Sequence, residues 1–230
     1  MTMLIAAAAT FFGIHLVISG TKLRDVIVHA IGESLYRGLF SLGSLAAIVW
    51  LCIAYKTAFA IPDNRILFEP AAWAREELAV PVMALAFLVA VPGLFTPNPG
   101  AVGQQGKVVE ARGIVRVTRH PFLWGVGIWA GFHLYAAGDL ASTIFFGTFL
   151  AVALLGTLAI DAKRRRKHAP SWQAFAAETS NLPFLAIVSG RNRFSAREYF
   201  DWRFLIALAV FGVMFFLHTR LFGIAPLNGF

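Results

Sequence analysis

Six long apolar runs dominate the 230-residue sequence and restrict what it can fold into. Each holds roughly 17 to 25 residues, the length of helix that crosses the hydrocarbon core of a bilayer. The runs are Thr2 to Ser19, Gly38 to Tyr55, Leu78 to Phe95, Pro121 to Ala137, Leu140 to Ile160 and Trp202 to Phe222. Because backbone polar groups in lipid must be satisfied within the segment, such spans must be helical. The sequence therefore predicts an all-α, polytopic membrane helix bundle of about six transmembrane helices.

The composition excludes several other classes of protein. Hydrophobic residues make up 58% of the chain, charged residues only 14%, and the mean hydropathy is +0.70, which is outside the range of a soluble domain. The net charge of +8 does not indicate nucleic-acid binding, because the basic residues lie between the apolar runs. We expect them to face the anionic lipids of the bilayer. The single Cys52 excludes a disulfide within the chain and makes a thiolate metal cluster an unfavourable interpretation.

The basic residues also predict an orientation. Most of them follow the first, third and fifth spans, so the positive-inside rule places those loops in the cytoplasm and both termini on the opposite side. The first run lacks a preceding basic segment, which favours a transmembrane helix over a cleaved signal peptide. Residues 171–190 contain Trp172, Phe175 and Ala176 at helical spacing, and we expect an interfacial helix on the cytoplasmic leaflet. We divide the chain into a membrane domain of five spans, 1–160, and a section of basic loop, interfacial helix and sixth span, 161–230.

Gly138 and Asp139 alone separate the fourth and fifth spans. So short a link forces an antiparallel hairpin, with Gly138 at the break and Asp139 as the N-cap of the next helix. Pro121 is likewise favoured in the first turn of the fourth span.

Two histidines lie inside predicted spans, His15 in the first and His133 in the fourth. An ionisable side chain within a span is costly and is a candidate functional residue. One interpretation is a neutral imidazole that hydrogen-bonds a neighbouring helix. The other is a shared ligand, because imidazoles from separate helices of a bundle provide the two axial positions of a haem. No HxxxH or HExxH pattern supports a protease-like metal site.

His120, in "TRHP", has both a structural and a functional interpretation. With Arg116 and Arg119 it could anchor the start of the fourth span to lipid headgroups, which its spacing favours, or bind a phosphate or a ligand carboxylate. The expected depths of His15 and His133 in the membrane differ by ~10 Å, which is more than two axial ligands allow in upright helices. His120 could then replace His133, or the site is of another kind.

Three segments resemble the NnrU family. "HPFLWGVGIWAGFHLYAAGDLAS", "GIHL" and "GESLYRGLFSLGSLA" are similar to its motifs, and the likeness runs from about residue 3 to 160. "GIVRVTRHPFLWG" also resembles the S-adenosylmethionine signature of the isoprenylcysteine carboxyl methyltransferases, which belong to the same superfamily as the plant 15-cis-ζ-carotene isomerases. The isomerases use haem b, and their haem-ligand histidines match His15 and His133.

The resemblance implies a protein of the bacterial inner membrane, and the distribution of the basic residues predicts that both termini lie in the periplasm. The leading hypothesis is a haem-binding protein that acts in nitrite and nitric oxide metabolism, as in denitrification, or isomerises an apolar polyene. The first alternative is a membrane methyltransferase in which Arg116, Arg119 and His120 hold S-adenosylmethionine. The second is a non-enzymatic accessory factor of a respiratory reductase.

Overall fold

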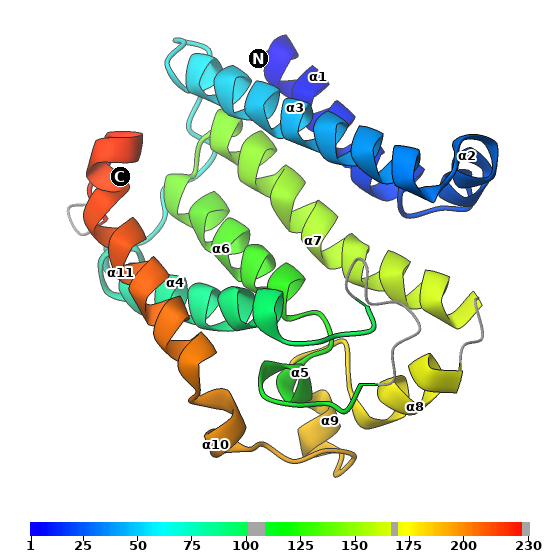
Figure 1. Cartoon of the computed structure of the whole chain (residues 1–230). Coiled ribbons are helices and arrows are strands. Elements are labelled where there is room, and N and C mark those ends of the chain that lie inside the picture. The colour runs from blue at the N-terminus through cyan, green and yellow to red at the C-terminus, as the bar shows by residue number, and fades with distance from the viewer. Residues whose placement is uncertain (101–108, 167–169, 227–230) are drawn as a thin grey trace. The chain divides into compact units, whose positions relative to one another are not determined.

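The computed structural model of the chain describes residues 1–100, 109–166 and 170–226, and these residues are predominantly helical (Figure 1). Apart from the helices, the described residues contain one isolated bridge, between Ile66 and Asp139. The predicted all-α class is confirmed. The elements are α1 Thr2–Phe12, η1 Gly13–Ile18, α2 Leu23–Ile31, α3 Glu33–Phe59, α4 Ala72–Phe95, α5 Ile114–Val117, α6 Pro121–Ala137, α7 Leu140–Arg166, α8 Pro170–Glu178, α9 Leu185–Val188, α10 Ala196–Tyr199 and α11 Trp202–Phe222.

Four of these helices are long and apolar enough to cross a membrane: α3, α4, α7 and α11. A fifth candidate is the segment Thr2–Ile18 followed by Leu23–Ile31, whose two parts are bent by 80°. Helix α6 has the predicted bounds and 17 residues, the lower limit of what spans a bilayer. The chain is therefore a multi-pass membrane protein whose long helices lie where the apolar runs predicted them. Among the described residues, four or five of the six predicted spans are long and apolar enough to cross a membrane, and α6 is not one of them.

The chain forms two compact units. Unit 1 comprises residues 1–71 and 130–159, and unit 2 comprises residues 72–129 and 160–230. This grouping by contacts differs from the division at residue 160, which rested on spans and family likeness and stays a prediction.

In unit 1, α1 packs along α3. The contact faces are rich in alanine, including Ala7 and Ala8 of α1 and Ala47, Ala54 and Ala58 of α3, all at most 7% exposed. Small side chains let two membrane helices approach closely, which is how helices associate where no hydrophobic effect drives them. This packing positions the end of α1 and the following turn η1 against α3.

The predicted hairpin between α6 and α7 is confirmed. Gly138 has φ +69°, and a Cβ there would overlap the carbonyl oxygen of Phe68. The Asp139 side chain accepts a hydrogen bond of 2.9 Å from the backbone N–H of Ser142, as an N-cap does. The Leu67 N–H donates to the Gly138 carbonyl at 2.9 Å, so the loop after α3 holds this turn in place.

In unit 2, α4 packs against α11 and against the start of α6. A Cβ on Gly125 would lie 2.5 Å from the Cβ of Ala90 and 2.6 Å from the carbonyl oxygen of Ala86, so only glycine permits this approach. Pro121 opens α6 as predicted.

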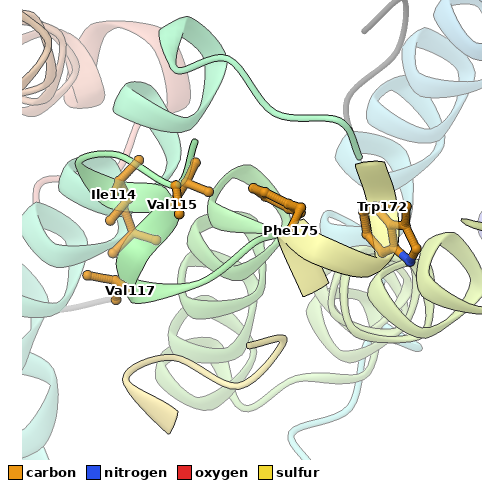
Figure 2. Close-up of a cluster of buried hydrophobic side chains, with 7 residues drawn as sticks. Ile114, Val115, Val117, Trp172 and Phe175 are labelled. Atoms are coloured by element: carbon orange, nitrogen blue, oxygen red, sulfur yellow. The ribbon is translucent and has the colours of Figure 1, made fainter. Parts of the chain in front are cut away.

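Helix α8 corresponds to the predicted interfacial helix, but its apolar side chains have a different role. Trp172 and Phe175 are 3% and 2% exposed and belong to a buried cluster that also contains Ile114, Val115 and Val117 of α5; Phe175 lies toward these residues, and Trp172 lies beyond it (Figure 2). The expectation that they lie on the lipid is wrong, because both side chains are buried in this cluster, which includes the short helix α5 that the sequence does not signal. The apolar face of α8 is thus part of the core of unit 2.

Candidate functional site

His15 lies in a π-helical turn. The helix formed by residues 2–18 changes from α to π geometry at Gly13, and the Ser19 N–H donates to the carbonyl of Ile14, five residues earlier, at 3.1 Å. A π turn inserts one extra residue into a helix, is rare, and occurs frequently at functional sites. Here it determines the direction in which the His15 side chain leaves the helix.

The His15 imidazole has a fixed tautomer. Its Nδ1 lies 2.8 Å from the carbonyl oxygen of Phe11. Since a carbonyl can only accept, Nδ1 carries the proton and donates, which leaves the lone pair of the neutral ring on Nε2. Metal-ligating histidines generally donate their other ring N–H to such a carbonyl, which orients the ring. His15 therefore has the donor chemistry of an axial ligand.

Aromatic rings surround His15. Its ring centroid lies 4.2 Å from that of Phe11 and 5.5 Å from that of Phe40, which approaches edge-on from α3. Phe11 in turn contacts Phe149 of α7, with centroids 5.1 Å apart. These rings form an apolar environment in which a neutral imidazole is favoured over its charged form.

His133 belongs to the same aromatic cluster. Its ring stacks on Phe146 of α7, with centroids 4.9 Å apart and an interplanar angle of 26°. Phe145 connects the two sides, at 5.0 Å from Phe146 and 5.2 Å from Phe149. Phe146, which contacts His133, and Phe149, which contacts Phe11, are thus about one turn of α7 apart, about 4.5 Å along the helix axis. His15 and His133 are thus linked through phenylalanine rings of α1 and α7, and we call this set the aromatic cluster: Phe11, His15, Phe40, His133, Phe145, Phe146 and Phe149.

His120 lies in unit 2, in a different environment. It is 5% exposed, and its Nε2 donates to Asp161 of α7 at 2.8 Å. Asp161, itself 3% exposed, also accepts from Arg119 through Nε at 2.9 Å and through Nη2. Arg119 further donates to the carbonyl of Thr179 at 3.2 Å. The expectation that Arg119 and His120 anchor to lipid headgroups is wrong, because a buried carboxylate binds both of them.

Arg116 also binds a carboxylate of the chain. Its Nε and Nη2 donate to the two oxygens of Glu198 on α10, at 2.8 and 3.0 Å, and its Nη1 donates to Asn192 at 2.7 Å. The hydrogen bond from Arg116 lowers the pKa of Glu198, and the same bond raises the pKa of Arg116. Arg116, Arg119 and His120 thus bind internal carboxylates, so the geometry favours a structural role for them over holding a cofactor carboxylate.

Sequence reasoning missed the acidic partners of this basic segment. Asp161 lies 42 residues from Arg119 and Glu198 lies 82 residues from Arg116, and no local pattern marks such a distance. The sequence offered one indication: Asp161 directly follows the fifth predicted span, where an acidic side chain without a basic partner would be costly.

The other histidines have simpler positions. His29 is exposed in the last turn of α2. His218 donates through Nδ1 to the carbonyl of Ile224 at 2.7 Å, beyond the end of α11. His168 falls outside the described residues.

Within the described ranges, no three His, Cys, Asp or Glu side chains gather as a metal site. A bare transition-metal ion commonly requires three or four protein ligands, whereas a haem brings its own four nitrogens and requires one or two. The aromatic cluster contains two imidazoles, the number of protein ligands that a haem can take.

Comparison with known proteins gives a family and two distant relatives. A family described as "NnrU protein" matches residues 3–226. The curated protein "15-cis-zeta-carotene isomerase, chloroplastic" of Zea mays is 26% identical over 182 residues, which are 75% of this chain and 47% of the relative. Its counterpart of the same name in Arabidopsis thaliana is 25% identical over 191 residues, 82% of this chain and 52% of the relative. The chain thus spans about half the length of the curated relatives it matches. No solved structure matches significantly.

Proposed function

The chain belongs to the NnrU family, and from that premise we propose that it is a membrane protein that binds haem b in unit 1 and isomerises a cis double bond of an apolar, carotenoid-like substrate. The observation that carries this proposal is the His15 ring, whose Nδ1–H donates to the Phe11 carbonyl and leaves Nε2 as a ligand atom. The names of the two relatives supply the reaction class.

His15 and His133 are the residues that would hold the haem, each through an imidazole nitrogen. His15 has the better-defined role, since its tautomer and direction are fixed by the hydrogen bond and by the π turn. His133, whose ring stacks on Phe146, would be the second residue to hold the haem.

When bound, the haem would supply a Lewis-acidic or redox-active iron. The chain would supply the surroundings. The Phe11, Phe40 and Phe149 rings would exclude water and offer flat apolar faces against which a polyene can lie. The Phe11 carbonyl would keep the proton on Nδ1 of His15 and so maintain Nε2 as the donor atom.

We further propose that the chain resides in a bacterial inner membrane with both termini in the periplasm, since most basic residues follow the first, third and fifth apolar runs. The lipid bilayer is then its constant partner. Nitrite and nitric oxide metabolism, with a respiratory reductase as partner, stays an expectation drawn from the family resemblance, and no contact in the structure favours it.

The proposal is tested by incubating the purified, haem-loaded full chain in lipid vesicles with 15-cis-ζ-carotene under reducing conditions and separating the isomers by chromatography. The unsubstituted chain should convert the 15-cis bond, and His15→Ala should not. His218→Ala is the matched control, because His218 also donates Nδ1–H to a backbone carbonyl but lies in unit 2. Equal conversion by His15→Ala would contradict the proposal, and a chain that neither binds haem nor converts the substrate would favour an accessory role.

A further inference from the structure

Two buried hydroxyl groups on α3 have no hydrogen-bond partner among the described residues: those of Tyr36 and Ser44. Both residues lie on one face of the helix with Phe40 between them, because positions four and eight residues apart line up along a helix. Tyr36 is 6% exposed. A buried polar group without a partner costs stability and calls for an explanation, such as a partner that arrives with a ligand.

This face of α3 is the one that contacts His15. Phe40 lies 5.5 Å from the His15 ring, and the Tyr36 ring stacks on Phe40 with centroids 6.0 Å apart and an interplanar angle of 22°. Helix α3 also packs against η1, which carries His15. The Phe40 ring therefore contacts both the His15 ring and the Tyr36 ring, and Tyr36 lies nearer the start of α3.

Positive charge lies beside Tyr36. The Arg24 guanidinium lies 5.2 Å from the centroid of the Tyr36 ring, and the Arg24 side chain is only 12% exposed. Arg24 donates to Glu33 at 2.6 Å and to Asp25 at 3.3 Å, which engages two of its five N–H groups. The basic residues of this bend are Lys22, Arg24 and Arg37, against the acidic Asp25 and Glu33. The local balance favours an anionic group as the missing partner of the Tyr36 hydroxyl.

We propose that Tyr36 recognises a carboxylate of the ligand held at His15, its hydroxyl donating a hydrogen bond to a carboxylate oxygen. The inference rests on the proposed function and deepens it: for a haem, the carboxylate is one of the propionates. The ligand then lies with its apolar body against Phe40 and its acidic edge toward Arg24. Ser44 lies two turns further along α3, at the apolar body.

The two hydroxyls provide a matched pair of variants. Tyr36→Phe and Ser44→Ala each remove one buried hydroxyl without a partner and leave the rest of the side chain in place. Removal of such a group does not destabilise the ligand-free chain, so neither variant should lower its melting temperature. Only Tyr36→Phe should weaken the binding of a ligand that carries carboxylates.

The test titrates hemin and hemin dimethyl ester, in which both carboxylates are blocked, into the detergent-purified full chain and follows binding by difference absorbance. Tyr36→Phe should weaken hemin binding about ten-fold or more, because a hydrogen bond to a charged group is lost. It should leave the affinity for the ester unchanged, and Ser44→Ala should bind both ligands as the unsubstituted chain does.

The outcomes separate this inference from the proposed function. If the unsubstituted chain binds hemin and His15→Ala does not, but Tyr36→Phe binds as tightly as the unsubstituted chain, the inference is overturned and the proposed function stands. If Tyr36→Phe weakens hemin and its ester equally, the ring packing and not the carboxylate is recognised, and the inference is again overturned. Failure of the unsubstituted chain to bind hemin overturns both.

Discussion

Replacing Asp161 with alanine should destabilise unit 2 by roughly 3–5 kcal/mol, the usual cost of removing one partner from a buried ion pair. Asp161 is 3% exposed and accepts from Arg119 at 2.9 Å and from His120 at 2.8 Å. Without it, the Arg119 guanidinium, whose side chain is 12% exposed, keeps its charge and loses its counter-ion. Hydrogen bonds to a charged group contribute roughly 1.5–3 kcal/mol each, so two such donors lead to the same magnitude.

The assay is thermal unfolding of the detergent-purified chain, followed by tryptophan fluorescence. A loss of this size should lower the melting temperature by on the order of 10 °C for a chain of this length. Glu110→Ala is the control, because Glu110 pairs with Arg112 at 2.8 Å while their side chains are 78% and 70% exposed. An exposed pair contributes about 0–1 kcal/mol, so this variant should melt close to the unsubstituted chain.

The three residues should also behave as one unit. The double variant His120→Ala with Asp161→Ala should cost less than the two single variants added, because each single change already leaves the other group without its partner. Two results would refute this reasoning. The first is a fall in melting temperature for Asp161→Ala no larger than for Glu110→Ala, and the second is a double variant whose loss of stability equals the sum of the single losses.

Three further predictions concern local structure and pH. Arg116 holds the pKa of Glu198 below its ordinary value of 4.5. The ion pair therefore stabilises unit 2 above pH 4.5, and this stabilisation is lost as the pH falls through the lowered pKa. Glu198→Gln should make the melting temperature less dependent on pH in the acid range. Gly138→Ala should cost at least about 1–2 kcal/mol at its positive φ, while Gly212→Ala, with open space around it, should be neutral or stabilising in the same melting assay. Asp139→Ala should cost about 1 kcal/mol by loss of the N-cap, and a melting temperature equal to that of the unsubstituted chain would contradict the cap.

Much of the fold follows from local rules that a sequence displays. The positions of the helices follow from apolar length, and the turn at Gly138 and Asp139 follows from the backbone freedom of glycine and the capping oxygen of aspartate. The bounds of α6, from Pro121 to Ala137, coincide with the prediction for the same reason. These features depend on neighbours within a few residues.

The parts that sequence reasoning could not supply depend on distant partners or on a change in bonding pattern. Asp161 meets His120 across 41 residues, and Trp172 is buried in a cluster whose other members include Val89 and Ile114, far from it in the sequence. The π turn around His15 differs from an α-turn by one residue in its hydrogen bonding, which leaves no mark in composition. His15 and His133 could be selected as candidates because imidazoles inside apolar runs are costly, whereas their shared aromatic cluster required the structure.

The absorption spectrum of the chain purified from haem-supplied cells tests the central claim most directly. We predict a Soret band in the unsubstituted chain and in His218→Ala, its loss in His15→Gly, and its return when imidazole is added to His15→Gly to occupy the space of the missing ligand. A spectrum without a Soret band in the unsubstituted chain, or a band of equal height and position in His15→Gly without imidazole, would contradict the assignment of His15 as a haem ligand.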